Sequence, residues 1–259
     1  MEIRTLPDAE RYLDGFINRE RVAGFDYEKL GLARVRGLLA AIGHPEAGLP
    51  CVHITGSKGK GSVALSAEAL LRAAGRHVGT YTSPHLETWR ERFRVDGEMV
   101  SVEGLLTSLR RIQPVVDRVR EDPETRPSFF DVTTALAFEI FRDAGVDAGV
   151  IEVGIGGRLD STNVVDSRAC VLTTVQLEHT DKLGNTLAEI AGGKAGNLKR
   201  GVPCEPPLRS SACLSRPRRP ASASSSWTSC AASPCSVCCS RTSSTSWSHR
   251  TSPSSRGRT

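Results

Sequence analysis

The 259-residue sequence contains no apolar run of about 18 residues, so no segment is predicted to cross a bilayer as a helix. Its N-terminus also lacks a basic region followed by an apolar stretch, which is the pattern of a secretory signal. Cysteine is scarce before residue 205, where only Cys51, Cys170 and Cys204 occur, and this argues against a disulfide framework. These absences predict a cytoplasmic protein with no membrane partner.

The last part of the chain, residues 205–259, lacks Asp, Asn, Gln, Lys, Ile, Phe, Tyr and Met altogether. It contains 18 Ser, 8 Arg, 6 Pro and 5 of the chain's 8 Cys. Such a composition offers few large apolar side chains to offset the entropy lost when a backbone is ordered. We therefore predict one folded domain over residues 1–204, followed by a disordered low-complexity tail over residues 205–259.

The positive charge of the chain belongs to this tail. Its eight Arg stand against one acidic residue, Glu205, whereas residues 1–204 carry 26 basic and 28 acidic side chains. The net charge of +5 is therefore no reason to expect a nucleic-acid partner for the folded part.

Back-translation suggests an origin for the tail. Residues 225–230, written as TCG TCG TGG ACG AGC TGC, give Val-Val-Asp-Glu-Leu when each codon starts at the third base. The same offset over residues 247–255 also yields an ordinary folded-protein sequence. We favour a frameshift product over a native disordered tail, and the pair Cys235 and Cys238 would then be accidental rather than a zinc site.

Helix-like and strand-like runs alternate before the tail. Apolar residues spaced by three and four predict helices, and short β-rich runs bounded by Gly or Pro predict strands. This alternation predicts an α/β fold, a mainly parallel sheet with helices on both faces. The helices are expected over residues 8–20, 27–41, 62–74, 103–120 and 129–144. The strands are expected over residues 51–55, 77–81, 92–95, 99–102, 148–153 and 169–175, with a turn at Asp96-Gly97 between the third and fourth.

A glycine-rich segment follows the first parallel strand and leads into a helix. Glycines let backbone N–H groups turn toward a phosphate, the helix N-terminus adds partial positive charge, and Lys60 can reach the β and γ phosphates of a nucleotide. The pattern is not a standard Walker A sequence, and a simple glycine turn is the alternative. The predicted ATP-binding residues are Gly56, Ser57, Lys58, Gly59, Lys60, Gly61 and Ser62.

Glu152 ends a strongly apolar strand, just before a second glycine turn. A carboxylate at the carboxyl end of a sheet strand, beside a phosphate loop, is placed to hold a hard cation such as Mg²⁺. A solvated strand-end acid is the alternative. The glycines from Gly154 onward do not form a dinucleotide fingerprint, because Leu159 stands where the third glycine is needed.

Three further residues have an ordinary alternative explanation when each is taken alone. His179 could be a metal ligand or a base, although a single histidine is more often structural. Lys194 could be an exposed lysine and Ser83 a turn residue.

Taken together, these segments resemble the dihydrofolate synthase and folylpolyglutamate synthase ligases, a branch of the Mur-type ligases. The resemblance covers about residues 10 to 203, through YLDGFINRE, VHITGSKGKGSV, YTSPHL, ERFRVDG, SFFDVTTALAF, IEVGIGGRLDSTN, LEHTDKLGNTLAEIA and KAGNLKRGVP. Such an ordered series is far more specific than any one motif. It implies the fold of the Mur-ligase central domain.

The resemblance also implies a site and a reaction. ATP with Mg²⁺ would bind through Lys60 and Ser62, and the cation would be shared by Ser83, Glu152 and His179. Lys194 matches a family lysine that becomes carbamylated and then holds a second cation. The segment from Gly157 to Thr162, which contains Arg158, Leu159, Asp160 and Ser161, would lie near the pterin end of the substrate.

The implied catalytic residues are Lys60, Lys194 and His179. The implied activity is ATP-dependent addition of L-glutamate to dihydropteroate or folate by a monomer, through an acyl phosphate.

Two other functions stay open at this point. Another Mur-type amino-acid ligase would carry a nucleotide-sugar domain before the phosphate loop, where only 55 residues precede Gly56. A non-catalytic remnant that binds nucleotide, or nothing, belongs to a different class. Because family members continue into a second α/β domain, the chain as given is expected to be truncated and impaired.

Overall fold

The computed structural model describes residues 1–18 and 31–199. Its centre is a six-stranded sheet in the order β4-β3-β2-β5-β1-β6. Strands β2, β5, β1 and β6 run parallel, and β3 and β4 form an antiparallel edge. The predicted mainly parallel α/β sheet is confirmed. The strands are β1 (Cys51–Thr55), β2 (Val78–Tyr81), β3 (Phe93–Val95), β4 (Glu98–Met99), β5 (Ala148–Glu152) and β6 (Ser167–Leu172).

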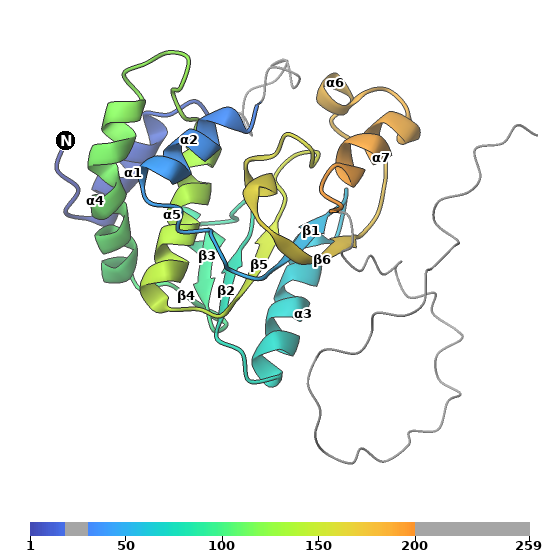
Figure 1. The fold of residues 1–259 in the computed structure, drawn as a ribbon, viewed down its shortest axis with the longest axis horizontal. Coiled ribbons are helices and arrows are strands. Elements are labelled where there is room, and N and C mark those ends of the chain that lie inside the picture. The colour runs from blue at the N-terminus through green and yellow to red at the C-terminus, as the bar shows by residue number, and fades with distance from the viewer. Residues whose placement is uncertain (19–30, 200–259) are drawn as a thin grey trace, which may run out of the picture. The chain divides into compact units, whose positions relative to one another are not determined.

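Helices cover both faces of the sheet (Figure 1). Helix α3 lies on one face, and α1, α2, α4 and α5 form a layer on the other, while α6 and α7 follow β6. The helices are α1 (Leu6–Asp14), α2 (Ala33–Ala41), α3 (Lys60–Ala73), α4 (Val102–Val119), α5 (Phe129–Ala144), α6 (Thr180–Leu183) and α7 (Leu187–Ala195), with 3₁₀ turns η2 (Trp89–Arg92) and η3 (Ser161–Val164).

Strand β5 shows why the sheet needs a helix on each face. All five of its residues are buried. Val150 packs in the cluster beneath α3, whereas Ile151 packs in the larger cluster that includes α5. Because successive side chains of a strand point to opposite faces, a strand that is apolar throughout must be covered on both.

Several element boundaries differ from the sequence-based prediction, and capping explains one of them. Helix α4 begins at Val102, which the sequence placed in a strand, because the Ser101 hydroxyl accepts a hydrogen bond from Gly104 N at 3.1 Å. Helix α1 ends at Asp14 rather than at residue 20. The predictions for residues 19–30, for Cys204 and for the tail at 205–259 lie outside the described residues.

His77 ties three elements together at the end of the sheet opposite the glycine loop. Its Nδ1 lies 2.5 Å from Asp96 Oδ2 in the β3–β4 turn, and its Nε2 lies 2.9 Å from the carbonyl oxygen of Ala144 at the end of α5. Both partners are acceptors, so the doubly protonated ring satisfies both contacts. The carbonyl of Ala144 first, and then Asp96, raise the pKa of His77.

This contact predicts a pH dependence of stability. Because the folded state holds the proton of His77 more tightly than the unfolded state, the stabilisation is complete below about pH 6.5 and is lost as the pH rises through the folded pKa. Urea unfolding of the wild type should therefore show a lower free energy of unfolding at pH 8 than at pH 6. His77→Asn should flatten this slope, and an unchanged slope would contradict the assignment.

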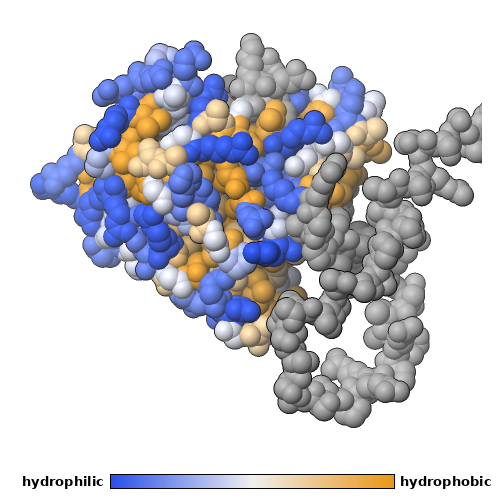
Figure 2. Space-filling model, in the orientation of Figure 1, coloured by the Kyte–Doolittle hydropathy of each residue, from blue (hydrophilic) through white to orange (hydrophobic). Residues whose placement is uncertain are grey.

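No helix among the described residues is long and apolar enough to cross a membrane. In Figure 2, hydrophilic side chains cover much of the surface over α4, and apolar patches lie between them nearer the middle of the view.

Candidate functional site

The glycine-rich loop connects the carboxyl end of β1 to the start of α3. Gly56 has a φ of +145°, and a Cβ at this position would lie 1.9 Å from Thr173 Oγ1. Gly59, with a φ of +83°, directly precedes the first residue of the helix. The loop therefore requires glycine at Gly56 for two separate reasons, conformation and space.

Two amides of the loop are held by the segment that follows β6. Ser57 N donates to the carbonyl oxygen of Thr174 at 2.8 Å, and Lys58 N donates to Thr174 Oγ1 at 3.0 Å. Thr173 Oγ1 in turn donates to the carbonyl oxygen of Lys58 at 2.7 Å. These bonds fix the loop against the segment that follows β6. The first turn of α3 then faces the carboxyl ends of the parallel strands.

The start of α3 has the properties of an anion site. Its first N–H groups have no carbonyl partner within the helix, and no side chain caps it. The helix dipole adds partial positive charge at the same place. Lys60, the first residue of α3, places its Nζ 3.4 Å from the carbonyl oxygen of Ser57, so its ammonium lies beside these amides.

Glu152 lies at the end of β5, close to this helix start. Its carboxylate accepts a hydrogen bond from Ser83 N at 3.2 Å, and a Cβ at Gly61 would lie 3.6 Å from Glu152 Oε2. Burial raises the pKa of Glu152 to about 7, although the charges of Lys60 and Arg92 oppose the shift. A buried carboxylate of this kind, next to a helix N-terminus, suits a hard divalent cation.

Lys194 on α7 is buried beneath the loop. Its Nζ donates to the carbonyl oxygen of Gly56 at 2.8 Å and to Glu178 Oε1 at 2.8 Å. Burial lowers the pKa of the Lys194 amine, even though Glu178 raises it. Partial burial raises the pKa of Glu178. The hydrogen bond and charge of Lys194, together with Ser57 and Lys60, outweigh burial, so the pKa of this carboxyl is lowered. The predicted lysine thus contacts the phosphate loop directly.

A cavity of about 350 Å³ is lined by four of the predicted residues, Ser57, Lys60, Ser83 and His179. His179, the N-cap residue of α6, has a φ of +46° and lines the cavity from the loop after β6. Partial burial lowers the pKa of its imidazole. Lys58 and Ser62 are exposed. The lining residues are Ser57, Lys60, Ser83, Pro84, His85, Arg92, Gly154, Ile155, Glu178 and His179.

The described residues contain no group of three or more His, Cys, Asp and Glu side chains already arranged to hold a metal ion. Ser83 and His179 nevertheless line the same cavity, and Glu152 accepts a hydrogen bond from Ser83 N. Lys194 contacts the neighbouring loop at the carbonyl oxygen of Gly56. The predicted cation ligands therefore stay a prediction.

The predicted substrate segment follows the turn of residues 154–157. Leu159 packs against a small apolar cluster with Leu183 and Ile190, and Arg158 is exposed. Ser161 Oγ donates to Asp131 Oδ1 at 2.6 Å, whereas the buried carboxylate of Asp160 caps the 3₁₀ turn that follows it. A substrate role for these residues stays a prediction too.

Sequence reasoning did not identify Arg92 and His85 as site residues. Arg92 is only 1% exposed, and its Nε donates to His85 Nδ1 at 3.0 Å. Its guanidinium carbon lies 5.2 Å from the centroid of the Phe129 ring. A buried arginine that lines a polar cavity cannot be recognised from spacing, because its burial depends on the packing of α5 against the sheet.

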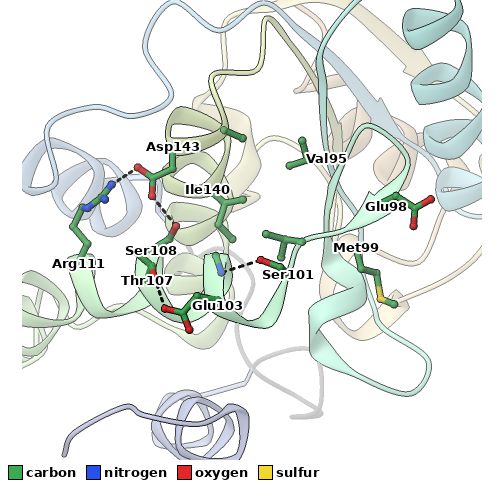
Figure 3. A pocket seen from close by; sticks show the side chains of 13 residues that line it. Val95, Glu98, Met99, Ser101, Glu103, Thr107, Ser108, Arg111, Ile140 and Asp143 are labelled. Carbon is green, nitrogen blue, oxygen red and sulfur yellow. Dashed lines mark hydrogen bonds and ion pairs between the residues drawn. The ribbon is translucent and has the colours of Figure 1, made fainter.

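A larger cavity, of about 550 Å³, lies at the other edge of the sheet between β4, α4 and α5 (Figure 3). Two of its charged groups are already paired with each other, since Arg111 contacts Asp143, and Ser108 Oγ donates to Asp143 at 2.8 Å. It has no glycine loop. The smaller cavity, beside the glycine-rich loop, is therefore the candidate functional site.

The chain has relatives among curated proteins and solved structures. No family model matches the chain. It is 40% identical over 176 residues to the dihydrofolate synthase/folylpolyglutamate synthase of Bacillus subtilis, which covers 68% of this chain and 41% of the relative. It is also 45% identical over 175 residues to a probable bifunctional folylpolyglutamate synthase/dihydropteroate synthase of Haloferax volcanii, covering 68% of this chain and 21% of the relative.

Curated relatives and solved structures consistently identify folylpolyglutamate/dihydrofolate synthase as what the N-terminal portion of this chain is similar to. A Mycobacterium tuberculosis folylpolyglutamate synthase, solved with ADP and AMPPCP, matches 74% of this chain and 41% of that chain, with a TM-score of 0.66 and 38% identity. A folylpolyglutamate synthase solved with AMPPCP and folate matches 78% and 48%, with a TM-score of 0.70 and 36% identity. The chain thus spans less than half the length of these family members.

Proposed function

We propose that this chain binds ATP with Mg²⁺ and forms the nucleotide-binding part of a ligase that joins L-glutamate to dihydropteroate or folate. The observation that carries the proposal is the meeting of Lys60, Glu152 and the first turn of α3 at the carboxyl ends of β1 and β5. Relatives solved with nucleotide analogues and with folate support it. We expect a cytoplasmic monomer.

The chemistry requires an activated carboxylate. A carboxylate reacts poorly with an amine, so its oxygen first attacks the γ phosphorus of ATP, and an acyl phosphate forms as ADP leaves. The α-amine of glutamate then attacks the acyl carbon, phosphate leaves, and the amine loses a proton as the amide forms. Because little covalent chemistry falls to the protein, positioning and charge neutralisation are its main contributions.

Each proposed residue has a role in that scheme. The amides at the start of α3, Lys60 and Ser62 would bind ATP with Mg²⁺. Ser83, Glu152 and His179 would share the cation. When bound, the cation neutralises charge on the transferring phosphoryl group. Burial of Lys194 favours its neutral amine, which is the form that reacts with carbon dioxide to give the proposed carbamate. Residues 158–161 would contact the pterin end of the substrate.

Calorimetry of the wild-type chain should show ATP binding that requires Mg²⁺. Glu152→Gln should remove most of the Mg²⁺ dependence, because the neutral amide is a weak cation ligand, while keeping binding of ATP alone. Glu121→Gln changes an exposed acid in the turn that follows α4 and serves as the control. A folded wild-type chain that binds no nucleotide would contradict the proposal.

We further propose that the 259-residue chain turns over slowly. The match covers only 41% of the Bacillus subtilis relative, and the composition of this chain changes after residue 204. Glutamate-dependent ADP release should be faster for a gene with the reading frame restored after codon 204. Equal rates for the two proteins would contradict this proposal.

A further inference from the structure

His53 is a fully buried histidine in the middle of β1, just before the phosphate loop. Burial lowers its pKa to about 3, so the ring is neutral at physiological pH. Its Nε2 lies 2.9 Å from Thr162 Oγ1, a residue 109 positions later in the chain. The proposed reaction gives His53 no role.

The direction of the hydrogen bonds follows from Asp160. Its carboxylate can only accept, so the Thr162 hydroxyl donates its hydrogen to Asp160 Oδ1. The Thr162 oxygen is then left to accept from His53 Nε2–H. His53 Nδ1 has no partner in the described part of the chain, which agrees with this tautomer. His53, Thr162 and Asp160 therefore form one relay of hydrogen bonds, in which His53 donates to Thr162 and Thr162 donates to Asp160.

The relay ends on the wall of the candidate cavity. Asp160 Oδ2 accepts from Ile155 N at 2.9 Å, and Asp160 Oδ1 accepts from Thr162 N at 3.0 Å. Ile155 and its neighbour Gly154 line the cavity opposite the phosphate loop. Two residues after His53, on the same face of β1, Thr55 Oγ1 donates to the carbonyl oxygen of Gly156 at 3.1 Å.

Strand β1 therefore supports two walls of one cavity. Its carboxyl end continues into the phosphate loop, and the side chains of His53 and Thr55 hold the turn of residues 154–157. We infer that His53 is a positioning residue that acts through Thr162 and Asp160 to hold this turn in place for the carboxylate substrate. The inference rests on the proposed function.

The test uses Thr162, because valine keeps the shape of the side chain and removes only the hydroxyl that connects His53 to Asp160. Thr162→Ser, which restores a hydroxyl, is the rescue variant. Thr80→Val is the matched control, since Thr80 is equally buried in the sheet and its Oγ1 has no partner in the described residues. All variants are made in the full chain.

Two measurements separate positioning from a merely structural role. In Thr162→Val, the Ile155 amide should exchange with solvent at least about tenfold faster. Folate should bind roughly 5- to 10-fold more weakly by calorimetry, while affinity for ATP with Mg²⁺ stays within about twofold. Thr162→Ser should recover both values, and Thr80→Val should change neither.

Each contrary result has its own meaning. Unchanged exchange at Ile155 would show that the relay does not hold the turn, and faster exchange with unchanged folate affinity would show that the turn does not position the substrate. Either result overturns the inference and leaves the proposed function intact. A wild-type chain that binds ATP but no folate overturns the proposed substrate and, with it, this positioning role, whatever the exchange rates show.

Discussion

Lys60→Ala is expected to weaken binding of ATP with Mg²⁺ by roughly 10- to 100-fold, the loss typical of a hydrogen bond between charged partners. Lys60 is the only lysine that lines the candidate cavity among the described residues, and its Nζ lies beside the unpartnered amides at the start of α3. Titration calorimetry at fixed Mg²⁺ measures the effect directly.

The control for this variant is Arg118→Ala, which removes one positive charge from an exposed position on α4, in the helix layer opposite α3. It separates the local contact from the change in net charge, and it should leave the affinity nearly unchanged. If both variants weakened binding equally, a general electrostatic effect would replace the phosphate contact as the explanation.

Gly56→Ala is expected to lower the free energy of unfolding by about 3 kcal/mol, because a side chain here is disfavoured by the backbone conformation and also collides with a neighbour. The new Cβ would lie 1.9 Å from Thr173 Oγ1 and 3.0 Å from Thr173 Cβ. Nucleotide affinity should fall with stability, since the loop must move away from β6 to make room. Urea unfolding measures the first effect and calorimetry the second.

A second-site change tests the cause. Thr173→Ala removes the closest atom, so the double variant Gly56→Ala/Thr173→Ala should recover part of the loss beyond the sum of the single effects. Gly48→Ala isolates conformational strain, because Gly48 has a φ of +77° but open space around it, and it should cost only about 1 kcal/mol. Equal losses in Gly48→Ala and Gly56→Ala would remove the collision from the explanation.

Local signals in the sequence were sufficient for much of the fold. The β-rich run at residues 51–55, the glycines that follow it and the helical period after them predicted β1, the loop and α3, because each depends on neighbouring residues. The Asp96-Gly97 pair predicted the β3–β4 turn, where both residues have positive φ. Helix α7 was missed, although the Thr186–Glu189 capping box marks its start.

Contacts between distant residues could not be predicted in the same way. Lys194 reads as an exposed lysine until α7 packs beneath the loop and brings its amine to Gly56 and Glu178. His53 and Thr162 lie 109 positions apart, and they contact each other only when β1 packs beside the 3₁₀ turn η3. In both cases the polar partner is set by tertiary packing, so a spacing rule cannot supply it.

The bonds that hold residues 57 and 58 against Thr174 bear on how fast the loop captures a ligand. A phosphate loop that is ordered only by its ligand must lose conformational entropy at the moment of binding, and this slows productive encounters. Here the sheet has already set the shape of the loop before any anion arrives. The rate of capture should therefore depend on diffusion and on the charge near Lys60 rather than on a rearrangement of the loop.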